Sequence, residues 1–533
     1  MLSSGSDPRE AEVRTSLAAK EPDAASATAP DVTRSAGRGG LAVAFAKLYF
    51  ILQGLIQQVA LPRVLGLDGY GALSSVLSIA SIAYNPVTTT SIQGVSRAVA
   101  QSTPENEAAT IRRTLSIHAA LAVFLAAVFF FLAPPLGDWV GAPHVVGGLR
   151  ILSGVMLLYG FYTPLVGVLN GQKKFLYQAG LDILTATLRT GGLIFGAYWF
   201  ARRFELGVEG ATLGFVGAAA LVLCVALALV GVGKPGVPSL TLKQHVSFIL
   251  PLLLGQALLN LLLQADLTLL RSFAADAAVR ANLPLRAADP LVGAYRATQL
   301  FSFLPYQMLI AITFILFPLL ASAHRTGDRA AVARYVQTGV RLALVLAGLM
   351  VSVTSGLSGP LLRLVFPAEA AELGTRTMQL ATLGFGAFAI LGILTTVLNS
   401  LNRERASAGI TATAFALVVL LCFLRVRGGP FGEELLWRTA LATSSGLVLA
   451  TLAAAFLVKR TAGAVVPPLS LVRVLVAMAV AIGVGRVLPY QGKLVTLIYA
   501  ATVATIYVAA LLLSRELTRA DANTVKAVIR RKR

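Results

Sequence analysis

Apolar stretches of about 20 residues recur along almost the whole chain, and they constrain the fold more than any other feature. A helix of this length crosses about 30 Å of hydrocarbon. Because the bilayer core offers no partner to a free peptide group, such runs must be helical or form a closed barrel. The chain is also 56% hydrophobic and only 13% charged, whereas soluble domains carry about a quarter charged residues. The sequence therefore predicts an all-α, polytopic integral membrane protein.

About fourteen transmembrane helices are expected, joined by short loops. The largest internal loop, residues 274–290, is too short to fold alone, so we expect a transporter without enzymatic activity. The expected spans are residues 40–60, 72–95, 114–134, 146–169, 179–200, 209–233, 246–271, 292–320, 336–356, 378–400, 407–425, 437–458, 470–488 and 493–514.

Basic residues near the segment ends predict the orientation of the helices. The net charge is +21. Many Lys and Arg lie in the loops expected on one side of the membrane, and such an excess is typical of cytoplasmic loops. We therefore expect both termini in the cytoplasm, and this charge needs no nucleic-acid partner. The predicted cytoplasmic loops and segment ends hold Arg112, Arg113, Lys173, Lys174, Lys234, Lys243, Arg325, Arg329, Arg403, Arg405, Lys459 and Arg460.

The two ends of the chain differ from its apolar middle. Residues 1–38 are rich in Ala, Ser, Pro and charged residues, which predicts a disordered cytoplasmic tail. Residues 516–533 form a basic cytoplasmic tail. Cys224, Cys422 and four scattered histidines indicate neither a disulfide framework nor a metal site. We expect no cofactor beyond a coupling proton or sodium ion.

Two short motifs recur at nearly one offset. DGYGAL precedes the second segment and VGAYRA opens the eighth, so that Tyr70 and Tyr295 are 225 positions apart (295 − 70). VLN recurs near the ends of the fourth and tenth segments, with Asn170 and Asn399 229 apart (399 − 170). This repeat indicates two pseudo-symmetric six-helix lobes, residues 39–235 and 236–462, followed by two helices at 463–515. Lobes of this kind can rock about a central cleft.

Polar side chains form narrow stripes on the first two helices of each predicted lobe. At about 100° per residue, Gln256, Asn260, Gln264 and Arg271 share one face of the seventh segment. Such a stripe cannot face lipid, because each polar group would lose water without gaining a partner. The stripes are therefore expected to line the cleft.

The predicted cleft is cationic and rich in amides. Guanidinium groups bind phosphate through paired hydrogen bonds, and Gln and Asn side chains bind sugar hydroxyls. This composition suits an anionic, hydroxyl-rich substrate. The candidate substrate-binding residues are Lys47, Gln53, Gln57, Asn85, Arg97, Asn260, Gln264, Arg271, Arg296 and Gln299. For the basic ones, snorkelling to the interface is the structural alternative.

Two carboxylates lie within predicted spans. Asp266 either pairs with a nearby arginine or forms a cation-coupling site, and we favour the pair. Asp182 and Arg189 share a face of the fifth segment. They form either a second intramembrane pair or a packing contact, and a structural role is favoured.

The motifs LPRVLGLDGYGALS, SIQGVSRAVAQ, VGVLNGQKKF, VGAYRATQLFSFLP and ILFPLLASAHRTGD resemble the polysaccharide-transporter branch of the multidrug/oligosaccharidyl-lipid/polysaccharide exporter superfamily. This branch includes O-antigen flippases and the stage V sporulation relatives of the lipid II flippase. The resemblance implies a two-lobed bacterial inner-membrane protein that flips undecaprenyl-diphosphate-linked oligosaccharide. It also implies polysaccharide polymerases and glycosyltransferases as partners, beside membrane lipids. Lys47 stands in the first helix, where the lipid II flippase has arginines.

Two other functions are open from the sequence. A cation-coupled multidrug exporter of the same superfamily would favour an acidic, aromatic cavity, and only Asp182 and Asp266 are clear intramembrane acids. A glycan ligase or polymerase would need catalytic residues in a large extracytoplasmic loop. The flippase is the function that we favour.

Overall fold

Residues 29–517 are described by a computed structural model, and they contain fifteen α-helices and two short 3-10 helices but no strand. The predicted all-α fold is confirmed. The helices are α2 (Ala29–Ala100), α3 (Glu107–Trp139), η1 (Pro143–Val145), α4 (Val146–Gly171), α5 (Phe175–Phe204), α6 (Gly207–Val230), α7 (Leu242–Arg280), η2 (Leu285–Ala287), α8 (Ala288–Ser302), α9 (Leu304–Arg325), α10 (Arg329–Gly356), α11 (Ser358–Val365), α12 (Ala368–Ser400), α13 (Glu404–Arg425), α14 (Glu433–Ala462), α15 (Pro468–Val487) and α16 (Lys493–Leu513).

Each of the fourteen expected spans overlaps helix in the structure. Within residues 29–517, eleven helical stretches are long and apolar enough to cross a membrane, so the protein is a multi-pass membrane protein. One of them, Phe45–Ala100, covers the second predicted span and most of the first, and α2 bends between the two at Gly66, where φ is 71°. The eighth expected span is interrupted at Phe303, between α8 and α9. Pro305 follows in the first turn of α9, where a missing N–H is tolerated.

The start of the first helix differs from the prediction. α2 begins at Ala29, so residues 29–38, expected to be disordered, are helical. Pro30 stands in the first turn, where its fixed φ suits a helix, and the apolar span that follows extends the same helix. Residues 1–28 and most of the predicted basic tail, 518–533, lie outside the described residues.

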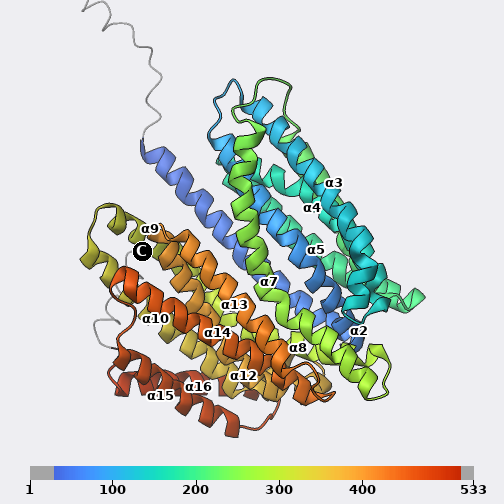
Figure 1. Cartoon of the computed structure of the whole chain (residues 1–533), viewed down its shortest axis with the longest axis vertical. Helices are drawn as coiled ribbons and strands as arrows, with labels where there is room; N and C mark the ends of the chain where they lie inside the picture. The colour runs from blue at the N-terminus through green and yellow to red at the C-terminus, as the bar shows by residue number, and fades with distance from the viewer. Residues whose placement is uncertain (1–28, 518–533) are drawn as a thin grey trace, which may run out of the picture.

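The first and second halves of the chain pack as separate groups of helices (Figure 1). In the first half, α5 packs on α6, and α2 packs on α4 and α5. In the second half, α12 contacts α8, α9, α10 and α14. The last two helices, α15 and α16, pack against α10, where Glu516 forms ion pairs with Arg341 and Arg473.

The two halves meet closely at the end of the bundle that holds Gly66, called here the Gly66 end. A Cβ added to Gly71 of α2 would lie 1.8 Å from the carbonyl oxygen of Asp289, and one added to Gly293 of α8 would lie 2.5 Å from that of Leu67. Only glycine permits this approach of two backbones. The opposite end, which holds the basic loops, is called the basic end.

Helix α7 contacts both halves. It packs against α2 and also against α13 and α14, and near its Gly66 end Phe273 contacts Phe423 of α13. In Figure 1 it runs between the α2–α6 group and the group that follows it. Helix α7 is therefore one of the elements, beside α2 and α8, that join the two halves.

Candidate functional site

A polar cavity of about 320 Å³ lies among α2, α5, α7 and α8. The two arms of α2 supply most of its wall, α5 adds Arg189 and Thr190, and α7 and α8 add Gln264 and Arg296. Residues from both halves of the chain therefore share one site. Cavities of this size are typical of small-ligand sites.

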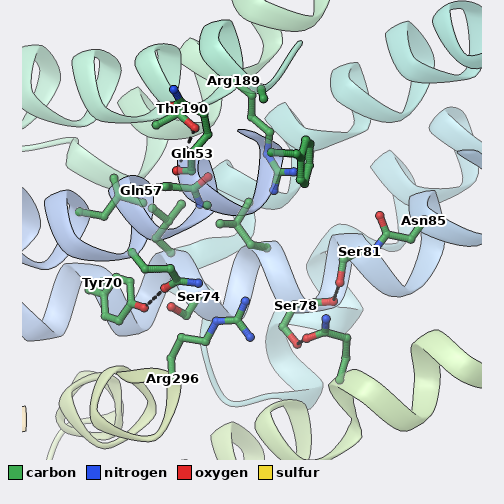
Figure 2. A pocket seen from close by; sticks show the side chains of 18 of the residues that line it. Gln53, Gln57, Tyr70, Ser74, Ser78, Ser81, Asn85, Arg189, Thr190 and Arg296 are labelled. Atoms are coloured by element: carbon green, nitrogen blue, oxygen red, sulfur yellow. Dashed lines mark hydrogen bonds between the residues drawn. The ribbon is translucent and has the colours of Figure 1, made fainter. Parts of the chain in front are cut away.

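Two guanidinium groups reach the cavity from different helices. Figure 2 shows Arg189 and Arg296 entering from opposite sides of the view. Arg189 lies over the ring of Phe215, 4.9 Å from its centroid, and its buried Nε has no hydrogen-bond partner among the described residues. The described lining residues include no Asp or Glu. The cavity is thus positively charged, with no carboxylate in its wall.

Amides and hydroxyls surround these two cations. Tyr70 donates a hydrogen bond to Gln58, and Ser78 donates to Gln264 over 3.0 Å. The remaining polar lining residues are Gln53, Gln57, Ser74, Ser81, Tyr84, Asn85 and Thr190. Most of these groups can both donate and accept hydrogen bonds, which suits a ligand with hydroxyl groups.

A buried network holds Arg296 in place. Its Nη1 donates to Gln299 over 2.9 Å, and Gln299 donates to both carboxylate oxygens of Asp266 at 3.1 and 3.2 Å. Tyr295 also donates to Asp266 over 2.8 Å. Asp266 therefore bonds to amide and hydroxyl partners, and the predicted direct pair with an arginine is not what the structure shows.

The structure brings half of the predicted substrate-binding residues to this cavity. Its wall contains Gln53, Gln57, Asn85, Gln264 and Arg296. Asn260 lies behind the wall and accepts a hydrogen bond from Asn85 over 3.0 Å, and Gln299 lies behind Arg296. The polar stripes in the sequence pointed to these residues, because a polar side chain within a membrane span has to face away from lipid.

Lys47 lies outside the cavity wall and binds Asp182. Its Nζ is 3.0 Å from the carboxylate of Asp182, and 63% of its side chain is exposed. Of the two alternatives for Asp182 and Arg189, the ion pair is therefore wrong. Asp182 pairs with Lys47 of α2, and Arg189 lines the cavity instead. The spacing of Asp182 and Arg189 on one helix could not reveal the helix opposite them.

Arg271 and Arg97 also lie away from the cavity. The side chain of Arg271 is 1% exposed, and its Nε is 3.2 Å from Asp289. It donates to the carbonyls of Gly141 and Leu285, so the location predicted for Arg271 is wrong: it ties the loops of the Gly66 end together. Arg97 lies over the ring of Phe248, 4.0 Å from its centroid, near the basic end.

The principal cavity residue that the sequence reasoning did not select is Arg189. A structural role, as an ion pair or a packing contact, was favoured for it, although its place inside an apolar span was the signal that could have identified it. Tyr70, Ser74, Ser78 and Ser81 were also missed, because small hydroxyl residues occur widely in membrane helices.

A second cavity of about 820 Å³ lies on another side of α7. Its wall is mainly apolar and comes from α2, α7, α9, α12 and α13. Gln256 of the predicted stripe, Tyr306 and Asn399 are among its polar residues. Helix α7 thus separates a polar cavity from a larger apolar one.

The chain is similar to known proteins in sequence and in fold. A family model described as "Polysaccharide biosynthesis protein" matches residues 36–324. No curated protein matches the chain. The structure resembles the lipid II flippase MurJ in its inward closed conformation, with a TM-score of 0.72 at 12% identity, over 89% of this chain and 99% of that one.

Two multidrug transporters share the fold as well. One is a MATE family transporter of the MOP superfamily in an inward-facing conformation, with a TM-score of 0.61 at 14% identity, over 78% of this chain and 94% of that chain. The other is the Vibrio cholerae MATE transporter VcmN in its bent form, with a TM-score of 0.53 at 17% identity, over 81% and 97%. At these identities the likeness establishes the fold alone, which is that of membrane transporters.

Proposed function

Because this chain belongs to the polysaccharide biosynthesis protein family, we propose that it is a flippase for undecaprenyl-diphosphate-linked oligosaccharide in the bacterial inner membrane. The head group crosses inside the protein, while the polyprenyl tail stays in lipid. Both termini lie in the cytoplasm in this proposal. The glycosyltransferases that build the glycan and the polymerase that consumes it are its proposed partners.

The observation that carries the proposal is the charge of the polar cavity. Arg189 and Arg296 face it, and no carboxylate is present among its described lining residues. A diphosphate that leaves water needs charge-assisted hydrogen bonds to replace its hydration. Two arginines from different helices can supply them, and the surrounding amides and hydroxyls match sugar hydroxyls.

Alternating access is the proposed route across the membrane. The described state is closed at the Gly66 end, where Gly71 and Gly293 bring α2 and α8 together and His144 contacts Asp289 at 2.8 Å. Release of the head group on that side requires these contacts to separate. Rocking of two similar bundles accomplishes this in transporters built from repeats.

The predicted residues that lie outside the cavity wall have supporting roles in this proposal. Lys47 and Arg97 are exposed and would meet the head group on its way to or from the cavity. Asn260 and Gln299 would act by holding Asn85 and Arg296. Asp266, which is buried beside Gln299, remains the proposed ion-coupling group.

Two alternatives differ in the substrate. A multidrug exporter that takes cationic drugs is disfavoured, because a cavity with two arginines and no described carboxylate repels cations. Lipid II carries the same diphosphate, and the shared fold with MurJ keeps it as a candidate. Only the glycan distinguishes this alternative from the proposed substrate.

The test uses the purified protein in liposomes that contain a fluorescent short oligosaccharide on polyprenyl diphosphate. Arg189→Gln and Arg296→Gln are each expected to slow flipping about 10- to 100-fold, since a hydrogen bond to a charged group contributes about 1.5–3 kcal/mol. Arg203→Gln is the matched control, because Arg203 is exposed on the same helix as Arg189 and lies over Trp199.

Three outcomes separate the candidates. Flipping of the oligosaccharide lipid that depends on both cavity arginines supports the proposal. Selective flipping of lipid II under the same conditions assigns the chain to that substrate. Equal rates for both arginine variants, the control and the unmodified protein would show that the cavity does not bind the diphosphate.

A further inference from the structure

Two buried histidines meet where α7 joins the first half of the chain. Nε2 of His118 on α3 and Nε2 of His245 on α7 lie 3.1 Å apart, and their rings pack edge to face. Nδ1 of His118 is 2.9 Å from the hydroxyl of Ser91 on α2. His118 and His245 are only 2% and 3% exposed. The pair therefore links three helices through titratable groups that the proposed transport site does not use.

The contact limits how many protons the pair can hold. A hydrogen bond between two imidazole nitrogens needs one N–H and one lone pair. Two neutral rings satisfy this, and so does a pair that carries one extra proton on a nitrogen outside the contact. When both rings are cationic, two N–H groups and two positive charges face each other. The hydrogen bond is then lost and the rings are driven apart.

The charges around the pair strengthen this repulsion. The charged residues nearest in sequence on the three helices are all basic: Arg97 on α2, Arg112 and Arg113 on α3, and Lys243 on α7. Arg97 and His245 line the same cavity of about 370 Å³, together with Gln101, Gln244 and Ser247. No carboxylate lies in the described wall of that cavity. A second positive charge on the histidines is thus left without a counter-charge.

The same cavity gives the pair a route to water. It lies at the basic end, where the loop before α7 meets the end of α2. Gly94 of α2 brings the helices into close contact, since a Cβ there would lie 2.6 Å from Ile249 and 3.5 Å from His245. The histidines therefore lie at the seam between α7 and α2, and His245 is the ring of the pair that lines the cavity.

The two halves of α7 have different neighbours. Its first half is attached to α3 through the histidine contact and to α2 at Gly94, and its second half also contacts the second group of helices. Phe273 contacts Phe423 with ring centroids 5.3 Å apart, and Arg280 donates to the carbonyl of Gly429. The second half also stays bound to the first group of helices, because Ser78 of α2 bonds to Gln264 and Thr268. Loss of the histidine contact therefore frees the basic end of α7 alone.

We propose that His118 and His245 form a proton-binding site that releases the basic end of α7 from α2 and α3 when both rings are protonated. The protons come from the aqueous phase at the basic end. The first binds the unprotonated ring nitrogen outside the contact, and the second binds the Nε2 lone pair that accepted the hydrogen bond between the rings, so that this hydrogen bond breaks. The inference rests on the proposed function only for its consequence, which is that protons set how far the cleft opens. The histidine site itself stands on the contacts above.

The experiment measures the seam directly in the full-length protein in lipid nanodiscs. Spin labels are placed at Ser116→Cys on α3 and Ser247→Cys on α7, both exposed positions, after replacement of Cys224 and Cys422. The distance distribution is recorded by pulsed electron paramagnetic resonance between about pH 8 and pH 3. This range extends below that in which exposed histidines titrate, because burial and the nearby basic residues oppose the second proton. A single short distance at high pH and a growing longer population at low pH are expected.

His245→Gln is the decisive variant. A glutamine side chain can accept a hydrogen bond from a protonated His118 or donate one to a neutral His118. The seam should therefore stay closed at every pH, and His118→Gln should behave in the same way. A matched control, His324→Gln at the exposed end of α9, should keep the full pH response.

The outcomes decide the two proposals separately. A distance that does not change with pH in the unmodified protein overturns the histidine site, and so does a change of equal size in both glutamine variants. Both of these distance results test the histidine site whether or not the protein flips any lipid. If the seam responds to pH while no glycolipid crosses in the liposome assay, the proton site stands and the proposed flippase function fails.

Discussion

Replacement of Asp289 with alanine should destabilise the Gly66 end. The carboxylate of Asp289 contacts Nε of Arg271 at 3.2 Å and Nε2 of His144 at 2.8 Å. The side chains of Arg271 and Asp289 are only 1% and 5% exposed. Removal of the carboxylate leaves a guanidinium in a place that water does not reach.

The size of the effect follows from the burial. Breaking a buried pair by removing one partner costs about 3–5 kcal/mol, because the remaining charge is uncompensated. Arg271 keeps its hydrogen bonds to the carbonyls of Gly141 and Leu285, which places the expected loss near the lower figure. The shift in Tm per kcal/mol of lost stability becomes smaller as a protein becomes larger. For a chain of this length the shift is about 1–2 °C per kcal/mol. A fall of ~5 °C in Tm is expected.

Thermal unfolding in detergent, followed by tryptophan fluorescence and by size-exclusion chromatography after heating, provides the assay. Arg271→Met with Asp289→Leu should recover most of the lost stability, since apolar replacement of a whole buried pair is often neutral. Arg280→Met, near the exposed end of the same helix, removes one hydrogen bond to Gly429 and should cost about 1 kcal/mol. If Asp289→Ala costs no more than this control, or the double variant is the least stable, the buried-pair reasoning is wrong.

Three further substitutions probe other contacts. Gly71→Val should prevent closure of the Gly66 end, because its Cβ would lie 1.8 Å from the carbonyl oxygen of Asp289; a lower Tm and greater labelling of cysteines at that end are expected. Glu516→Gln should lower Tm by several degrees, since this carboxylate is 1% exposed and serves both Arg341 and Arg473. Lys47→Ala should change the free energy of unfolding by less than about 1 kcal/mol, because most of the lysine side chain is exposed.

Matched controls make these three results interpretable. Gly255→Val adds the same side chain to α7 where nothing lies within 4 Å of the new Cβ, and it should cost only the helix propensity of valine. Glu369→Gln, at an exposed position in the first turn of α12, should leave Tm nearly unchanged. Equal effects at Gly71 and Gly255, or at Glu516 and Glu369, would contradict the packing described here. A large destabilisation by Lys47→Ala would show that its pair with Asp182 is shielded from water.

The sequence alone was sufficient to predict the membrane helices. A bilayer imposes length and polarity on each span independently of its neighbours, so every expected segment could be read locally. The same local rule selected Gln53, Gln264 and Arg296 for the cavity, because a polar stripe on an apolar helix cannot face lipid. Breaks within helices, such as the one at Phe303, were hidden from it, and so were helix extensions such as the start of α2 at Ala29.

The partners of the charged residues were decided by the tertiary structure. Asp182 is seven residues from Arg189 on one helix, yet it pairs with Lys47, 135 positions away. Arg271 belongs to the same stripe as Gln264 but reaches Asp289 beyond the cavity. A polar stripe on a membrane helix indicates only which face of that helix avoids lipid. Whether that face meets a carboxylate, a carbonyl or an open cavity depends on how the helices are placed against one another, and no local pattern contains that information.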